Sequence, residues 1–313
     1  MKSYKLIGVL LTLFGAILWG ISGTSVQFLS HYKHINLEWL ITMRLLTAGV
    51  LTVIYAWYQQ GSPIIKVFHN RTDLLGLLTF GVLGMALCQY SYFQSIALAG
   101  VGVATVLQYL APSMIIVYLL IRFGKRPSSG ESFSVLLALV GIVCLMGKDS
   151  LSFESIPYAV LLWGLLSAVG VAVYSVSPVV LLSRYGTLPI VGFGMILSGI
   201  VAAILFHQPY SEVIWDWETV IGCFNVVFLG SIVSFNAYLE GVKRIGAVPG
   251  AILSSVEPIS AALFGWALLG NEFTLVGIFG MICIIATVFI IAWDRQRQIK
   301  RDVLNKLKKE EVT

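Results

Sequence analysis

Residues 74–121 read LLGLLTFGVLGMALCQYSYFQSIALAGVGVATVLQYLAPSMIIVYLLI and contain no charged side chain. A helix needs about 20 apolar residues to cross the hydrocarbon core of a bilayer, so this stretch is too long for one crossing. The turn is expected at Ala99 to Gly102, because glycine interrupts helices. The stretch therefore predicts two membrane-spanning helices joined by a tight turn.

The composition of the whole chain indicates the same class of protein. The chain has 313 residues, of which 58% are apolar and 11% are charged, whereas soluble domains are roughly 25% charged. So few charges cannot cover the surface of a soluble fold, but a surface that faces lipid can stay apolar. The sequence therefore predicts an all-α integral membrane protein.

The cysteines all lie inside apolar runs, and the sequence has no Cys-x-x-Cys pair and no Cys/His cluster. This pattern indicates neither a disulfide framework nor a zinc site. We expect the four to be small residues of the core, and we expect no metal and no other cofactor. They are Cys88, Cys144, Cys223 and Cys283.

Apolar runs of spanning length recur along the chain, and we predict ten transmembrane helices with short connections. The first run, Leu6 to Leu29, is too long for the apolar region of a signal peptide, so we interpret it as a helix. No stretch is left over for a soluble domain. The runs begin near Leu6, Leu37, Leu74, Val101, Phe133, Tyr158, Pro189, Thr219, Ala247 and Thr274.

Lysine and arginine gather on the cytoplasmic side of membrane proteins. With ten helices and a cytoplasmic N-terminus, all 20 lysines and arginines fall inside except Lys33 and Lys148, which fall outside, and Arg44, which lies within a span. We therefore expect a multi-pass protein of the plasma membrane with both termini in the cytoplasm. The net charge of +5 then belongs to the cytoplasmic rim and indicates no nucleic acid. The basic tail either lies on anionic lipid or is solvated.

A weak internal repeat appears when the chain is aligned with itself at a shift of 146 residues. The charges do not coincide, since Lys125-Arg126 falls opposite Asn271-Glu272. Equivalent loops thus lie on opposite sides of the membrane, as an odd number of helices per half requires. We predict two inverted five-helix repeats, 1–147 and 148–294, and a cytoplasmic tail, 295–313. The identities are Tyr92 with Tyr238, Gly100 with Gly246, Leu107 with Leu253, Pro112 with Pro258, and Gly124 with Gly270.

The first helices of the halves align at a different shift. Leu29-Ser-His-Tyr32 matches Leu182-Ser-Arg-Tyr185 at a shift of 153, and we prefer this match to Leu18-Trp-Gly20 with Leu162-Trp-Gly164 because it falls at the same loop in both halves. Inverted halves can exchange conformations, which opens a site near the midplane first to one side and then to the other. The repeat therefore predicts alternating access.

Several short motifs occur in a fixed order along the chain: Ala16-Ile-Leu-Trp-Gly20, Arg44-Leu-Leu, Gln108-Tyr-Leu-Ala-Pro112, Val256-Glu-Pro258 and Gly270-Asn-Glu272. In this order they resemble the EamA-type permeases of the drug/metabolite transporter (DMT) superfamily, over nearly the whole chain. Asn271 departs from the usual Gly-Glu pair, so no role is carried over to Glu272. The resemblance implies ten helices, cytoplasmic termini, and export or uptake of small metabolites, often amino acids.

Two charged residues fall inside expected spans, where a charge costs several kcal/mol and indicates function. Glu257 is expected midway along the ninth helix, and Arg44 roughly 10 Å into the second at 1.5 Å per residue. Arg44 would bind a substrate carboxylate or Glu257. Glu257 would bind a proton or a substrate amine. The alternatives are a structural ion pair, or an arginine that reaches the headgroups.

Pro112 and Pro258 are expected in mid-helix, where each removes a hydrogen bond and frees the carbonyl four residues earlier. Such paired kinks predict hinges or cavity-lining helices, with simple packing kinks as the alternative. Polar residues at matching depth predict a central site, with interhelical hydrogen bonds as the alternative. The expected substrate-binding residues are Trp19, Arg44, Gln89, Tyr90, Gln108, Asn236 and Glu257.

These features together predict a secondary transporter for a small metabolite, most simply an amino acid or a related compound. The alternative is an uptake carrier for a cationic amine such as choline, held by Trp19 and Glu257 through cation–π and ionic attraction. Protons are a candidate coupling ion, since no phosphate-binding Gly-Lys-Ser/Thr loop is present. An intramembrane enzyme is a distant alternative, because the sequence lacks HExxH and pairs no candidate serine with a buried histidine.

Overall fold

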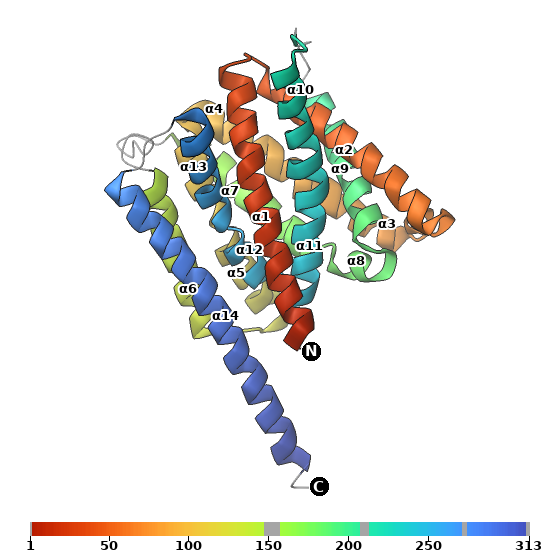
Figure 1. Cartoon of the computed structure of the whole chain (residues 1–313). Helices are drawn as coiled ribbons and strands as arrows, with labels where there is room; N and C mark the ends of the chain where they lie inside the picture. The colour runs from red at the N-terminus through yellow and green to blue at the C-terminus, as the bar shows by residue number, and fades with distance from the viewer. Residues whose placement is uncertain (1, 147–156, 207–212, 271–273, 311–313) are drawn as a thin grey trace.

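The computed structural model of the chain describes residues 2–146, 157–206, 213–270 and 274–310. These residues form a bundle of helices without any strand (Figure 1). Eight helical stretches are long and apolar enough to cross a membrane, and two shorter apolar helices, Ser129–Cys144 and Leu275–Ile291, accompany them. The prediction of an all-α membrane protein is therefore confirmed.

The first part of the bundle runs to residue 146. Its elements are α1 (Lys2–His31), α2 (Leu37–Gln60), the 3-10 helix η1 (Ser62–Phe68), α3 (Arg71–Leu78), the π-helix η2 (Thr79–Ala86), α4 (Leu87–Gln108), α5 (Ala111–Phe123) and α6 (Ser129–Met146).

The second part begins at residue 157. Its elements are α7 (Tyr158–Val176), α8 (Val179–Tyr185), α9 (Thr187–Leu205), α10 (Trp217–Phe224), the π-helix η4 (Asn225–Val233), α11 (Ser234–Ile245), α12 (Ala247–Leu253), α13 (Val256–Leu269) and α14 (Leu275–Glu310).

The chain reverses direction within the residues assigned to α4. The hydroxyls of Tyr92 and Thr105 are hydrogen-bonded at 2.8 Å, although 13 residues of straight helix would separate them by about 20 Å. The amide of Gln108 likewise reaches Cys88 Sγ at 3.4 Å. The reversal lies between residues 92 and 105, the interval that contains the expected turn.

Pro112 and Pro258 each lie within one apolar span, Ala104–Phe123 and Ala247–Leu268, and the regular helix is interrupted just before each proline. The chain leaves α4 at Gln108, and α5 begins at Ala111 with the proline in its first turn. Similarly, α12 ends at Leu253, and α13 begins at Val256. A proline in the first turn removes no helical hydrogen bond, because that N–H would have no intrahelical acceptor.

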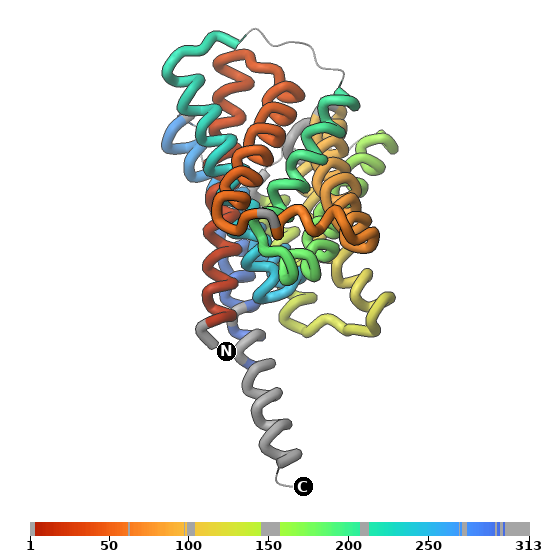
Figure 2. Tube along the Cα trace, turned by 90° about the vertical axis from the view of Figure 1, so that its right-hand side faces the viewer, coloured from red at the N-terminus to blue at the C-terminus, as the bar shows by residue number. Residues whose placement is uncertain are grey.

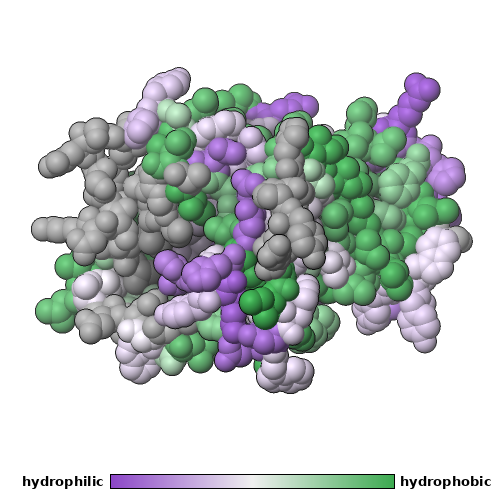
Figure 3. Space-filling view, turned by 90° about the horizontal axis from the view of Figure 1, so that it is seen from above, coloured by the Kyte–Doolittle hydropathy of each residue, from purple (hydrophilic) through white to green (hydrophobic). Residues whose placement is uncertain are grey.

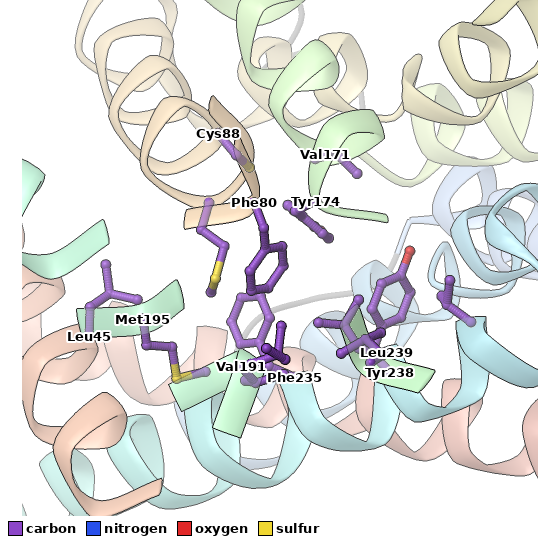
Figure 4. Packing of buried hydrophobic residues seen from close by; sticks show 14 of the residues in the cluster. Leu45, Phe80, Cys88, Val171, Tyr174, Val191, Met195, Phe235, Tyr238 and Leu239 are labelled. Carbon is purple, nitrogen blue, oxygen red and sulfur yellow. The ribbon is translucent and has the colours of Figure 1, made fainter. Parts of the chain in front are cut away.

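Helices from the two parts of the chain interleave. α2 packs along α9, α6 along α14, α4 along α7, and α1 against both α11 and α13. Figure 2, turned by 90°, shows most of the helices running in one common direction. Buried side chains fill the centre, and Figure 4 shows Phe80, Tyr174 and Tyr238 converging there from η2, α7 and α11.

Large apolar side chains are exposed around the bundle, on α1, α2, α6, α9 and α14 among others. Figure 3, seen from above, shows a group of hydrophilic residues in the middle of this face beside hydrophobic residues on its flank. So many exposed apolar side chains around the bundle suit a lipid environment.

Two backbone features recur 146 residues apart. The π-helices η2 and η4 begin at Thr79 and Asn225. The helices α5 and α13 end at Gly124 and Gly270, whose φ angles are 63° and 72°. Because only glycine enters this left-handed region without strain, these two identities have a conformational cause.

Candidate functional site

A small cavity of about 30 Å³ lies where the two interrupted helices meet. The ends of α4 and α12 and the starts of α5 and α13 form one wall, and α1 and α7 form the other. Four expected residues, Trp19, Gln108, Pro112 and Glu257, therefore come together. The full lining is Trp19, Gln108, Tyr109, Ala111, Pro112, Val171, Tyr174, Ala251, Ser254 and Glu257.

Glu257 lies midway along the span Ala247–Leu268, as expected, and in the first turn of α13. The positive end of a helix dipole stabilises a negative charge there. Its Oε2 accepts a hydrogen bond from the hydroxyl of Tyr109 at 3.2 Å, and that hydroxyl also lies 3.3 Å from the Ser254 carbonyl oxygen. The interruption of the helix before Pro258 thus places a carboxylate at the end of a helix and beside a cavity.

The Ser254 carbonyl was expected to need a partner because of Pro258. It accepts a hydrogen bond from the Glu257 N–H at 2.9 Å as well as lying near the Tyr109 hydroxyl. The chain therefore satisfies this carbonyl locally, as a buried backbone group requires.

Gln108 forms a polar part of the cavity wall. Its amide nitrogen donates to Ser167 Oγ at 2.8 Å and to Cys88 Sγ at 3.4 Å. The bond to Ser167 joins α4 to α7, and the two bonds together hold the amide in one orientation. The amide oxygen is the acceptor that Gln108 has to offer a ligand.

Aromatic rings form the opposite wall. The Trp19 ring packs against Phe235 with centroids 4.9 Å apart and against Tyr238 with centroids 5.0 Å apart. Tyr174 lies 6.2 Å from Tyr238 by the same measure, and the Tyr238 hydroxyl is hydrogen-bonded to Ser175 at 3.0 Å. The wall is thus fixed by ring packing and presents Trp19 and Tyr174 to the cavity.

Arg44 lies on α2, and its Nε is buried without a hydrogen-bond partner. No ion pair within 4.0 Å joins it to Glu257, so the alternative of a structural ion pair between these two described residues is not observed. A buried donor of this kind needs an acceptor, since a buried charged group without a hydrogen bond costs several kcal/mol.

Like Arg44, three further residues that were expected to bind substrate lie outside the cavity lining. Tyr90 packs between Trp163 and Phe206, with ring centroids 5.6 and 5.4 Å away. Asn236 donates to the Ile232 carbonyl at 2.7 Å, and Gln89 is half-buried on α4. Tyr90 thus makes ring contacts and Asn236 a hydrogen bond within its own helix, whereas the alternative weighed for such polar residues was interhelical hydrogen bonding.

Sequence reasoning missed Tyr109 and Tyr174 as cavity residues. Tyr109 was within reach, since it follows Gln108 in a motif already singled out. Tyr174 lies in an ordinary apolar run of α7 and gives no comparable signal.

The model of the EamA-like transporter family matches this chain twice, over residues 6–147 and 159–293. The chain belongs to the EamA-like transporter family. It is therefore a multi-pass membrane protein, and the family is one of transporters and not of enzymes. Both the recognition of the family and the assignment to the DMT superfamily are confirmed.

Two relatives and one solved structure support this membership. The uncharacterized inner membrane transporter YicL of Salmonella typhimurium is 32% identical over 293 residues, which cover 94% of this chain and 97% of that protein. The pseudopaline exporter CntI of Pseudomonas aeruginosa is 27% identical over 202 residues, covering 64% of this chain and 68% of that protein. A protein of known crystal structure shares the fold at 20% identity, with a TM-score of 0.73 over 95% of this chain and 99% of that one.

Proposed function

We propose that this EamA-like protein carries a small zwitterionic metabolite, most simply an amino acid, across the plasma membrane by alternating access. The observations that carry the proposal are the Glu257 carboxylate in the cavity wall and the Arg44 side chain, whose Nε is buried without a hydrogen-bond partner. A zwitterion would supply an acceptor for Arg44 and a cation for Glu257.

The expected chemistry divides the substrate between the two charges. Arg44 presents a fork of N–H donors that suits a carboxylate. Glu257 would bind the ammonium group, and Trp19 and Tyr174 would add cation–π attraction from the facing wall. Gln108 would accept a further hydrogen bond through its amide oxygen.

A cationic amine is the second candidate substrate. The carboxylate of Glu257 and the aromatic ring of Trp19 line the same cavity, and this combination suits an amine without any carboxylate. Arg44 separates the two hypotheses, because an amine carrier would not need it.

The proposed architecture is ten spans arranged as two inverted halves. Its support comes from the eight long spans and two shorter apolar helices, from the double match of the family model, and from the backbone features that recur at a shift of 146. The helix pairing also has two-fold character: α1 packs on α11 as α7 packs on α4, while α2 pairs with α9 and α6 with α14.

Both chain ends leave the bundle at the same end (Figure 1), as an even number of spans requires. The excess of lysine and arginine at that end supports a cytoplasmic location for both termini.

Uptake into proteoliposomes tests the proposed function. Labelled amino acids, amines and nucleobases are screened with and without a pH gradient, which also tests protons as the coupling ion. Glu257→Gln and Arg44→Gln should each abolish amino acid uptake, whereas Glu240→Gln should not, because Glu240 pairs with Lys243 and Arg244 away from the cavity. Full uptake activity of Glu257→Gln would show that Glu257 is not part of the site. Uptake of amines alone, at a rate unchanged by Arg44→Gln, would favour the second candidate.

A further inference from the structure

Two clusters of charged residues join the halves at opposite ends of α2. The outer cluster, named for the proposed orientation, is Lys33, Asp216 and Glu218. Lys33 Nζ lies 2.5 Å from both Asp216 Oδ2 and Glu218 Oε2. It joins the loop after α1 to the start of α10 (Figure 1).

The inner cluster is Asp73, Arg184 and Tyr185. Arg184 donates through one nitrogen to both carboxylate oxygens of Asp73, each at 2.6 Å, and the Tyr185 hydroxyl donates to Asp73 Oδ2 at 2.6 Å. The cluster joins the first turn of α3 to the end of α8. Because Lys33 precedes α2 and Asp73 follows it, the two clusters are separated by the 24 residues of that helix.

The two clusters are equivalent in chain position. Lys33 follows the first helix of the first half, and Arg184 ends the first helix of the second half. Asp216 is the N-cap of α10, and the corresponding N-cap of α3 is Asn70, 146 residues earlier and three residues before Asp73. In both clusters a cation from the first helix of one half therefore binds a carboxylate at the start of the third helix of the other half.

An aromatic pair accompanies each cluster and follows the same rule. At the outer end Trp39, in the first turn of α2, packs on Trp215 with centroids 6.4 Å apart. At the inner end Phe193, in the second turn of α9, packs on Phe68 with centroids 4.8 Å apart. Each pair joins the second helix of one half to the residues just before the third helix of the other.

From this recurrence we propose that the two clusters act as the two gates of the transporter: the outer cluster holds the outer face closed, the inner cluster holds the inner face closed, and each must separate before its face opens. The inference rests on the proposed alternating access. It assigns Lys33, Asp73, Arg184 and Asp216 a role in setting which face is open, apart from any contact with substrate.

The gates differ in strength. The carboxylates of the outer cluster are 43% and 66% exposed, whereas the side chain of Asp73 is only 5% exposed and accepts three hydrogen bonds. Exposed ion pairs contribute little, and hydrogen bonds to a buried charged group contribute more. The protein therefore rests with its inner gate closed and opens outward more readily.

Cys88 provides a native reporter for the test. Its thiol is buried and accepts a hydrogen bond from Gln108 in the cavity wall. A charged methanethiosulfonate that cannot cross lipid is applied to full-length protein in right-side-out or inside-out vesicles, and modification of Cys88 is quantified by mass spectrometry.

Removing one gate should raise labelling from one face only. Asp216→Asn with Glu218→Gln should raise outside labelling about two- to fivefold, and Asp73→Asn should raise inside labelling about tenfold. Arg184→Gln breaks the same inner ion pair by changing its exposed member, so this variant replaces Asp73→Asn if that one does not fold. The control is Glu240→Gln, whose ion pairs lie within the second half.

The outcomes separate this inference from the proposed function. Face-specific labelling that follows the removed cluster supports the gates. Labelling of Cys88 from both faces that is insensitive to either cluster would leave alternating access standing and overturn the gates. Labelling from one face in every variant would overturn both.

Discussion

Gly20 lies in α1 at its closest approach to α13, the helix that carries Glu257. A Cβ atom at this position would lie 2.6 Å from the backbone oxygen of Glu257 and 2.6 Å from the backbone nitrogen of Ala261. The Ser260 hydroxyl also donates to the Ile17 carbonyl at 2.8 Å across the same contact. Gly20→Ala therefore tests whether close packing of α1 and α13 holds the site together.

The cost follows from the distances. Ordinary contacts of a Cβ begin at 3.4 Å, so α13 would have to move by roughly 0.8 Å, and overpacking of this kind costs about 1–3 kcal/mol. The obstacles are two backbone atoms and the Cβ of Ser260, none of which can rotate away as the far end of a flexible side chain could. The same movement would stretch the bond between Ser260 and Ile17 and shift Glu257 relative to Trp19.

Thermal unfolding of the purified protein in detergent measures the effect, together with uptake in proteoliposomes. Gly23→Ala is the matched control, because it lies one turn further along α1 with nothing within 4 Å of its Cβ. It should be neutral, or stabilising by up to about 1 kcal/mol through helix propensity. Equal melting temperatures for Gly20→Ala and Gly23→Ala would refute the reasoning.

Three further predictions concern single groups. Tyr109→Phe removes the hydroxyl that lies near Ser254 and Glu257, and unfolding in detergent should show a loss of about 1 kcal/mol; an unchanged melting temperature would mean that the hydroxyl does not bond either group. The Lys33 ammonium and the Thr219 groups lower the pKa of Asp216 to about 2, so its stabilisation is complete above the ordinary pKa near 4 and is lost as the pH falls towards 2. The difference in melting temperature between wild type and Asp216→Asn should therefore shrink across that interval, and a constant difference would contradict the ion pair. Pro258→Ala should leave the melting temperature nearly unchanged, because the first turn of α13 loses no hydrogen bond at Pro258. A gain of several degrees would instead show that Pro258 removes a helical hydrogen bond, as a proline in mid-helix does.

The sequence predicted the class of fold because hydrophobicity over 20 residues is a strong signal. It also identified Trp19, Gln108 and Glu257, which line one cavity. It predicted distorted helices at Pro112 and Pro258 but not where each helix stops and resumes, because a proline suits either a kink or the first turn of a new helix.

For Tyr90 and Asn236, the sequence could not predict the direction in which each side chain points. Both follow closely on a π-helix, where each turn holds more residues than in an α-helix. The extra residues rotate the side chains that follow around the helix axis. The expected depth of a residue in the membrane therefore does not determine which neighbour its side chain faces.

The last helix, α14, runs unbroken over 36 residues, which corresponds to about 54 Å at 1.5 Å per residue. The hydrocarbon core is only about 30 Å thick, so this helix continues well beyond the lipid as a lever. A few degrees of tilt among the spans would become a displacement of several ångströms at its free end. A fluorophore attached there would make each turnover visible as a movement in water, far from the substrate.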